Sequence, residues 1–253
     1  MSTADELRSR TAVVTGAASG IGRAIALALA SEGARVAAAD LDLDGAQETV
    51  ALARDAGGEV HAFAVDVTDA ESVGALHAAI DAALGPVDVV VNNAGWTNSE
   101  PFLENTPQLW SRVVAINLVG PMIVAHTFLK PLVASGRSGV VVNVSSDAGR
   151  VGSTGETSYA GAKGGVIAFT KSLAREMARY GVTVNSVSPG PTDTPMLRRQ
   201  PEQFRDALVR AVPLRRFATP EDIAAAVCFF ASPRASYITG QVLSVSGGLT
   251  MAG

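Results

Sequence analysis

The sequence is poor in the residues that build disulfide frameworks and metal sites. Its 253 residues include one cysteine, Cys228, and only three histidines. A single cysteine cannot form a disulfide within the chain, and the scattered histidines do not supply the ligand cluster that a zinc ion needs. We therefore expect no disulfide framework and no metal ion. The lack of a disulfide framework also gives no reason to place the protein in an oxidising compartment.

Charged residues are also scarce, at 17% of the chain against about 25% in an average globular protein. The formal net charge is −4, and the chain has no long run of lysine and arginine residues. Nucleic acids and anionic membranes bind such basic runs, so neither is an expected partner. Because 47% of the residues are hydrophobic, the chain has enough apolar side chains for a large buried core. These values exclude a disordered protein.

Long uninterrupted apolar segments are missing as well. The first ten residues are polar and mixed in charge, unlike a secretory signal. The longest apolar stretch, residues 113–125, contains Asn117, Gly120 and Pro121. We expect this stretch to fall short of a membrane span and the protein to be cytoplasmic.

Short β-branched segments alternate with longer alanine-rich segments along the whole chain. This alternation predicts an α/β fold in which helices cover both faces of a parallel sheet. The expected strands are residues 12–14, 36–39, 60–65, 87–91, 140–144, 182–187 and 242–245. The expected helices are residues 21–31, 43–56, 70–84, 107–133, 157–180 and 220–231. Residues 1–253 should thus form a single domain with a doubly wound sheet, and the Pro- and Arg-rich residues 189–220 should form a lid.

The first expected strand leads directly into a glycine-rich turn and then into a helix. Gly16 permits a tight turn, Gly20 lets the backbone approach a phosphate, and Gly22 lets the helix pack close to the sheet. A strand, turn and helix N-terminus of this kind bind pyrophosphate. Asp40 ends the second expected strand, where a carboxylate accepts both ribose hydroxyls of an adenosine. The same carboxylate would repel a 2′-phosphate, which favours NAD over NADP.

A tyrosine and a lysine lie four residues apart in the fifth expected helix, so their side chains share one face. Because a nearby ammonium favours a phenolate, we expect Lys163 to lower the pKa of Tyr159 by about 1–3 units. Ser146 ends the strand 140–144, at the edge of the sheet where α/β proteins bind ligands. We expect Ser146 to orient a substrate oxygen and Tyr159 to act as general base, with the neighbouring Ser145 as the alternative serine.

These motifs resemble the short-chain dehydrogenase/reductase family. The resemblance rests on the glycine turn at residues 15–22, Asn92-Asn93-Ala94-Gly95, Tyr159 with Lys163, and Pro189-Gly190, and it covers residues 11–248. It implies a Rossmann-like sheet of seven strands, a nicotinamide cofactor, and hydride transfer between an alcohol and a carbonyl. It implies the catalytic residues Asn117, Ser146, Tyr159 and Lys163. It implies the NAD-binding residues Gly16, Ser19, Gly20, Ile21, Gly22, Asp40, Asp66, Val67, Asn93, Ala94, Gly95, Tyr159, Lys163, Pro189, Gly190, Thr192 and Thr194.

The resemblance carries three further implications. Members that prefer NADP have a basic residue at the positions of Ser19 or Leu41, so these residues also favour NAD. The main chain of Asn117 would hold a water molecule that joins Lys163 to solvent, completing a proton relay. The family further implies a homotetramer that pairs the long helices at residues 107–133 and 157–180 between subunits.

The substrate is expected to lie against the loops at residues 96–104, 147–157 and 191–212. Candidate substrate residues in these loops are Trp96, Asp147, Arg150, Glu156 and Met196. Arg150 either pairs with Glu156 at the surface or donates to a thioester carbonyl.

The loops and the tail at residues 238–253 are similar to those of family members that oxidise a ring hydroxyl β to a CoA thioester. A small-molecule substrate, a cyclic β-hydroxyacyl-CoA thioester, is therefore expected. One alternative is a 3-oxoacyl thioester reductase of the acyl-carrier-protein type, or a reductase of another ketone, although Asp40 fits the NADPH of the carrier-protein type poorly. A redox-inactive nucleotide-binding sensor is a second alternative, which would need only the nucleotide end of the site.

Overall fold

The computed structural model describes residues 7–198 and 202–251 of the chain. At its centre is a seven-stranded parallel sheet with the strand order β3-β2-β1-β4-β5-β6-β7. The strands are β1 (Thr11–Thr15), β2 (Arg35–Asp40), β3 (Glu59–Ala64), β4 (Val89–Asn92), β5 (Gly139–Val144), β6 (Val182–Pro189) and β7 (Val242–Val245). The strands expected from the β-branched segments are all present, and the predicted seven-stranded Rossmann-like fold is confirmed.

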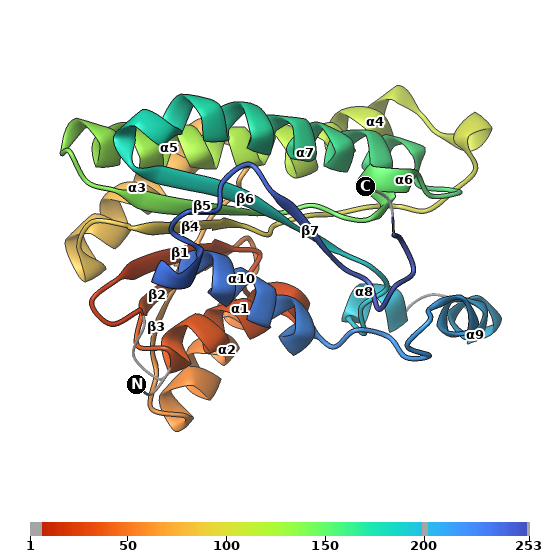
Figure 1. Ribbon diagram of the computed structural model, residues 1–253, viewed down its shortest axis with the longest axis horizontal. Helices are drawn as coiled ribbons and strands as arrows, with labels where there is room; N and C mark the ends of the chain where they lie inside the picture. The colour runs from red at the N-terminus through yellow and green to blue at the C-terminus, as the bar shows by residue number, and fades with distance from the viewer. Residues whose placement is uncertain (1–6, 199–201, 252–253) are drawn as a thin grey trace.

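Helices cover both faces of the sheet (Figure 1). One face packs against α1 (Gly20–Ser31), α2 (Leu43–Asp55) and α10 (Pro220–Ala231). The other face packs against α3 (Ala70–Leu84), α5 (Gly120–Ala134) and α7 (Thr157–Met177). Each face has its own core of Val, Ile, Leu and Ala side chains, and burial on both faces explains why the central strands are continuously apolar.

Side chains at the helix starts fix where several helices begin. Asp42, Asp69 and Thr106 each accept a hydrogen bond from a backbone N–H in the first turn of the following helix. At α10, Thr219 and Asp222 form a reciprocal capping box, and Pro220 occupies the first turn. These caps satisfy backbone donors that have no partner inside the helix, so the local sequence and the overall fold agree on the helix boundaries.

The expected helix at residues 107–133 is present as a continuous helical segment with an irregular middle. It consists of α4 (Pro107–Val114), a π-helical turn (Ala115–Val119) and α5. The π turn contains Asn117, whose Nδ2 donates to the carbonyl of Val113 at 2.9 Å. By length and composition alone, Pro107–Ala134 is long and apolar enough to cross a membrane, with 44% of its most apolar window buried in the fold.

The apolar stretch at residues 113–125 thus lies inside a longer helical segment, because Asn117, Gly120 and Pro121 are accommodated in the π turn and the first turn of α5 without ending the helix. Such a segment is weak support for a membrane span, since the core helix of a soluble protein passes the same test. Here α5 packs against α3 and the sheet. The cytoplasmic location stays a prediction.

The strand order reverses around β1 and β4, which is the point where open α/β sheets bind ligands beyond the carboxyl ends of their strands. Beyond these ends lie α8 (Pro195–Arg198) and α9 (Glu202–Ala211) on one side, and α4 and α6 (Ala148–Val151) on the other (Figure 1). Three 3-10 turns complete the fold: Phe102–Glu104, Ala178–Tyr180 and Pro233–Ala235. The expected lid at residues 189–220 thus contains two helices that the alternation did not predict.

Candidate active site

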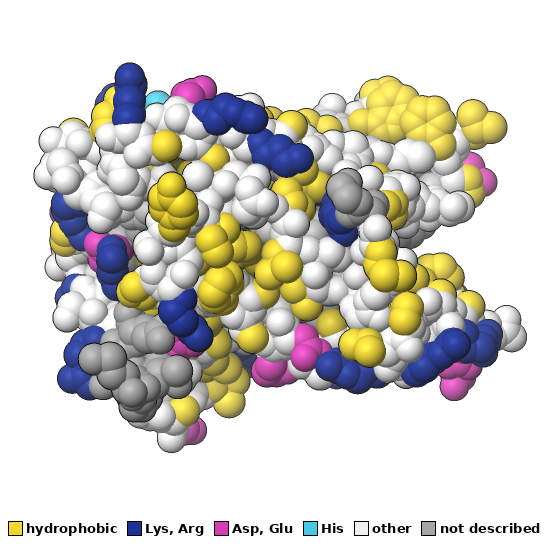
Figure 2. Space-filling view, viewed as in Figure 1, with side chains coloured by type: hydrophobic (Ala, Val, Ile, Leu, Met, Phe, Trp, Pro, Cys, Tyr) yellow, Lys and Arg dark blue, Asp and Glu magenta, His cyan; other side chains and the backbone are white. Residues whose placement is uncertain are grey.

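A pocket of about 1000 Å³ opens beyond the carboxyl ends of the strands. Figure 2 shows the molecule hollowed on this side. Most of the expected site residues line this pocket: Gly16, Ser19, Gly20, Ile21, Gly22, Asp40, Asp66, Val67, Asn93, Ala94, Gly95, Trp96, Ser146, Asp147, Glu156, Tyr159, Lys163, Pro189, Gly190, Thr192 and Thr194. Residues from distant parts of the sequence are therefore brought together in one cavity.

The glycine turn leaves no room for side chains at two of its three glycines. Gly16 has a φ of +69°, and a Cβ at Gly22 would lie 2.0 Å from the Gly16 carbonyl oxygen. Asn93 holds this turn, because its Nδ2 donates to the carbonyls of Thr15 at 2.9 Å and of Gly16 at 3.1 Å. The turn delivers the chain to the N-terminus of α1 with its backbone exposed to the pocket, and helix N-termini of this kind bind phosphates.

Asp40 lies at the end of β2, beside the glycine turn. Its carboxylate accepts hydrogen bonds from the backbone N–H of Ala18 at 2.8 Å and of Asp42 at 3.0 Å. These bonds fix the carboxylate at the wall of the pocket. Arg23, the basic residue of α1, is engaged elsewhere: it pairs with Glu48 at 2.8 Å. The adenosine end of the pocket therefore offers a fixed anion.

Asp66 and Val67, expected near the adenine, follow β3 and line the pocket. Thr68 donates to the Asp66 carboxylate from its hydroxyl at 2.6 Å and from its backbone N–H at 2.8 Å, and these bonds hold the pKa of Asp66 below its usual value. Opposite this loop, Thr194 approaches the glycine turn, since a Cβ at Gly20 would lie 3.5 Å from its Cγ2. The segment after β6 thus closes the cavity beside the turn.

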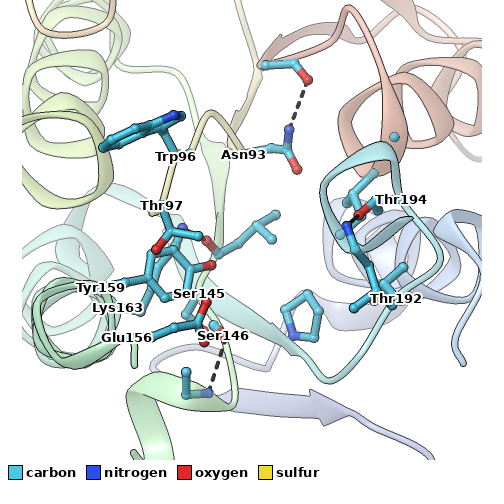
Figure 3. Close-up of a pocket in the computed structure, with 18 of the residues that line it drawn as sticks. Asn93, Trp96, Thr97, Ser145, Ser146, Glu156, Tyr159, Lys163, Thr192 and Thr194 are labelled. Atoms are coloured by element: carbon cyan, nitrogen blue, oxygen red, sulfur yellow. Dashed lines mark hydrogen bonds between the residues drawn. The ribbon is translucent and has the colours of Figure 1, made fainter. Parts of the chain in front are cut away.

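Tyr159, Ser146 and Lys163 form the other end of the pocket (Figure 3). Lys163 is almost fully buried, and its Nζ donates to the carbonyl of Val144 at 2.8 Å. The Nζ also lies 5.7 Å from the centre of the Tyr159 ring. The Ser146 hydroxyl lies at the same end of the pocket as Tyr159 and accepts a hydrogen bond from the backbone N–H of Ala148 at 3.2 Å.

The pKa of Tyr159 differs from the sequence expectation. Burial, and to a lesser extent the negative charge of Glu156, raise the pKa of Tyr159 to about 12, while the Ser146 hydroxyl opposes this change. Burial also lowers the pKa of Lys163 to about 8. The expectation that Lys163 lowers the pKa of Tyr159 was wrong for this structure, because desolvation of the phenol outweighs the attraction of an ammonium aimed at Val144.

Ser145 and Ser146 take different positions although they are neighbours. The Ser145 hydroxyl lies in a buried network, where it bonds to the carbonyl of Val187 and to the hydroxyls of Ser186 and Ser188. This network joins β5 to β6. The Ser146 hydroxyl lies outside this network at the end of the pocket that holds Tyr159, so the geometry favours Ser146 over Ser145 as the reacting serine.

Asn117 lies beside the pocket without lining it. Its fully buried side chain accepts from the backbone N–H of Trp96 at 3.2 Å and donates to the carbonyl of the same residue at 2.6 Å. The side chain therefore clamps the loop after β4, while the role of its main chain in a proton relay stays a prediction. Arg112 stacks 4.0 Å above the Trp96 ring, and both residues line the pocket.

Arg150 has different partners from those expected. It donates to Asp147 at 3.2 Å and to the hydroxyl of Thr250 at 3.3 Å, and it does not line the pocket. Glu156 bonds instead to Ser153 and Ser99. Among the described residues Arg150 therefore does not pair with Glu156, and it lies outside the pocket in which the thioester contact was expected. Arg150 ties the loop after β5 to the C-terminal segment.

Asp147 is similarly occupied, since it also accepts hydrogen bonds from Ser244 at 2.9 Å and from Thr250. The side chain of Met196 lies outside the described residues. Several pocket residues were not predicted individually: Thr97, Ser99, Arg112, Ile116, Val151, Leu249 and Thr250. Thr97, Ser99 and Val151 belong to loops expected at the site, whereas no motif marks Arg112, Ile116, Leu249 or Thr250.

Comparisons with known proteins agree with this geometry. A sequence model of the family described as enoyl-(acyl carrier protein) reductase matches residues 16–250. A (3R)-3-hydroxyacyl-CoA dehydrogenase from Rattus norvegicus is 44% identical over 253 residues, covering 97% of this chain and 98% of the relative. A cis-4-hydroxycyclohexanecarboxylate dehydrogenase from Sinomonas cyclohexanicum is 42% identical, covering 95% and 96%. A 3-oxoacyl-(acyl-carrier-protein) reductase from Thermotoga maritima is 38% identical, covering 97% and 99%.

A solved structure, described as a short-chain alcohol dehydrogenase from Sinorhizobium meliloti 1021, superposes with a TM-score of 0.92 at 34% identity, covering 98% of each chain. The chain belongs to the short-chain dehydrogenase/reductase family. The resemblance expected from the four motifs is thus confirmed. As a short-chain dehydrogenase/reductase, the protein is an oxidoreductase whose relatives act on CH–OH groups or on the corresponding carbonyls.

The pocket of this short-chain dehydrogenase/reductase fits the nicotinamide dinucleotide that its family uses. The glycine turn is a cradle that a Cβ at Gly22 would fill, and it stands at a helix N-terminus suited to a pyrophosphate. Asp40 is placed for an adenosine ribose at one end of the pocket, and Lys163 for a ribose at the other. These residues would hold the cofactor with its reactive ring near Tyr159.

Proposed function

We propose that this protein is an NAD-dependent dehydrogenase that interconverts a secondary alcohol and a ketone on a β-hydroxyacyl thioester. The observation that carries the proposal is the occurrence of Ser146, Tyr159 and Lys163 in the same pocket as the glycine turn and Asp40. A nucleotide-binding sensor needs only the glycine turn and Asp40. An acid–base group beside a hydrogen-bonded serine is needed only for a reaction.

The chain's own residues account for the proton chemistry. The bound nicotinamide supplies the acceptor or donor of the hydride. In oxidation, Ser146 holds the hydroxyl of the substrate, Tyr159 takes its proton, and the carbinol carbon loses a hydride as the C=O bond forms. In reduction, Tyr159 gives its proton to the new alkoxide. Lys163 holds the nicotinamide ribose and stabilises the Tyr159 phenolate.

Asp40 supports NAD as the cofactor. Its carboxylate is fixed by two backbone N–H groups, so it cannot turn away from a 2′-phosphate without losing those bonds. Ser19 and Leu41, the neighbouring positions where a basic residue would bind the phosphate, are uncharged. Like-charge repulsion therefore favours NAD.

The relatives support a thioester substrate. The chain matches a (3R)-3-hydroxyacyl-CoA dehydrogenase over nearly its full length, and it matches a dehydrogenase of a cyclic hydroxy acid nearly as well. A 3-oxoacyl-(acyl-carrier-protein) reductase is also similar, which keeps carrier-protein thioesters as the second candidate. Phe204, on α9, lines the pocket with an exposed side chain, and this side chain suits an apolar acyl chain.

We also propose a homotetramer. Val119 and Met122 lie on the long helical segment that the family resemblance places between subunits, and both side chains are exposed in the single chain. Covering such apolar side chains in a symmetric contact is favourable. Light scattering at micromolar concentration should give the mass of four chains, and a monomeric mass would contradict this assembly.

The proposed function is tested with a substrate panel. We expect NAD-dependent oxidation of a (3R)-3-hydroxyacyl-CoA, followed by absorbance of the NADH formed, with kcat/KM above that for cis-4-hydroxycyclohexanecarboxylate. The reverse assay compares 3-oxoacyl-CoA with 3-oxoacyl-(acyl-carrier-protein). NADH binding, measured by fluorescence, without turnover of any alcohol or ketone would support the sensor and contradict the proposal.

A further inference from the structure

Glu156 places a carboxylate in the catalytic end of the pocket. It lies just before α7, three residues before Tyr159, and it lines the same cavity as Ser146 and Tyr159 (Figure 3). Its carboxylate accepts hydrogen bonds from the hydroxyl of Ser153 at 2.9 Å and from that of Ser99 at 3.4 Å. Across residues 7–198 and 202–251, no Lys, Arg or His forms an ion pair with it.

Two loops hold this carboxylate in place. The backbone N–H of Glu100 donates to the carbonyl of Gly155 at 3.0 Å, which joins the loop after β4 to the loop that carries Glu156. The bond from Ser99 to Glu156 joins the same two loops beside it. The backbone of Glu156 accepts the first hydrogen bond of α7, from Ala160 at 2.7 Å. The side chain therefore belongs to a built wall of the pocket.

The other charged side chains that line the pocket either have hydrogen-bond, ion-pair or stacking partners or lie at the nucleotide end. Lys163 directs its ammonium to the carbonyl of Val144, and the charge of Asp147 is balanced by Arg150. Arg112 also lines the pocket, but it stacks on the Trp96 ring and is exposed to solvent. Asp40, Asp42 and Asp66 line the nucleotide end of the pocket. Glu156 is thus the carboxylate whose field reaches Tyr159, and this field contributes to the raised pKa of the phenol.

We propose that Glu156 is a specificity-determining residue that makes the catalytic end of the pocket select neutral acyl groups and reject substrates with a free carboxylate on the carbon adjacent to the reacting carbon. The inference rests on the proposed function and narrows its substrate class. A thioester, an ester or an amide is neutral at this position, whereas the free β-hydroxy or β-oxo acid brings a second anion close to Glu156. Two anions in a half-buried pocket repel each other more strongly than in water.

A matched pair of substrates tests this inference. Methyl acetoacetate and acetoacetate differ in one group, the carboxyl group one CH2 away from the reacting carbon, which is a neutral ester in the first and a carboxylate in the second. We expect the wild-type protein with NADH to prefer the ester by about tenfold or more in kcat/KM. Glu156→Gln keeps the size and hydrogen-bonding oxygen of the side chain. It should raise kcat/KM for acetoacetate by about tenfold and change that for the ester by less than about threefold.

Glu100→Gln is the matched control, because Glu100 lies on the adjoining loop and does not line the pocket. It should leave the preference for the ester unchanged. An unchanged preference in Glu156→Gln would overturn the inference, as would an equal change in both variants. A loss of ester turnover in Glu156→Gln would show instead that Glu156 binds the substrate as an acceptor, which also overturns it.

A binding measurement separates this inference from the proposed function. The Tyr159→Phe protein with bound NADH should bind methyl acetoacetate and acetoacetate without reducing them. Quenching of NADH fluorescence then measures the affinity for each compound. We expect tighter binding of the ester by about tenfold and a smaller ratio when Glu156→Gln is added. If the wild-type protein reduces neither compound, the proposed function fails while this affinity ratio still tests Glu156. Equal affinities, or no binding of the ester, would overturn the inference.

Discussion

The ammonium of Lys163 lies 5.7 Å from the centre of the Tyr159 ring and donates to the carbonyl of Val144 at 2.8 Å. The two side chains share one face of α7, as their spacing predicts, but the lysine is directed past the phenol to β5. The pKa of Tyr159 is therefore set chiefly by its burial, which raises it to about 12. A phenol with this pKa is protonated at neutral pH, ready to act as an acid in ketone reduction.

The pH dependence of the two directions should consequently differ. Oxidation needs the phenolate, whose fraction rises about tenfold per pH unit below the pKa, so kcat/KM for the alcohol should rise steadily between about pH 6 and about pH 9. Reduction needs the phenol, so its kcat/KM should stay level over the same range. Initial rates in both directions at saturating cofactor measure these profiles. An oxidation rate that is independent of pH across this range would contradict the assigned role of Tyr159.

The cofactor preference should depend on the charge of Asp40. The wild-type protein should favour NAD over NADP by at least about tenfold in kcat/KM, which corresponds to about 1.4 kcal/mol of repulsion. Asp40→Asn removes the charge and keeps an oxygen that can accept from Ala18, although it loses the bond from Asp42, so it should narrow this ratio. Asp44→Asn, in the first turn of α2, serves as the control and should leave the ratio unchanged. Equal use of both cofactors by the wild-type protein would refute this preference.

Two helix glycines should respond in opposite ways to alanine. At Gly22 a Cβ would lie 2.0 Å from the Gly16 carbonyl oxygen, so Gly22→Ala should lower the free energy of unfolding by about 1–3 kcal/mol and weaken NADH binding. At Gly74, in α3, a Cβ meets nothing within 4 Å. Gly74→Ala should therefore raise the free energy of unfolding by about 0.5–1 kcal/mol. Urea unfolding measures both changes, and similar effects of the two substitutions would contradict the packing described for the glycine turn.

Much of the fold is predictable because its signals are local. The β-branched segments and the alanine-rich segments have different periods and lengths, and the central strands of the parallel sheet are buried on both faces. Gly16, Gly20 and Gly22 reveal the nucleotide turn because backbone geometry there requires glycine. The sequence pattern that would predict α9 is weaker, because this short helix buries no residue and therefore needs no apolar face.

The partners of charged residues were less predictable than the motifs. Arg150 was expected to meet Glu156 or a thioester, yet it bonds to Asp147 and to Thr250, a residue a hundred positions away. Sequence spacing carries no information about such a contact. The desolvation of Tyr159 is equally hidden, since the burial of a phenol depends on how several loops close over it. The motifs predicted which residues meet, whereas the electrostatics required the structure.

The most direct test of the account is the effect of Tyr159→Phe on turnover and on NADH binding, measured on the same protein. The ring still fills its site, but the transferable proton is gone, so kcat should fall by roughly 100-fold or more while the NADH affinity stays within about threefold of wild type. Tyr180→Phe, on the exposed 3-10 turn after α7, is the control and should keep wild-type kcat. A Tyr159→Phe protein that retains more than about a tenth of wild-type kcat would contradict the central claim that Tyr159 is the acid–base residue of this dehydrogenase.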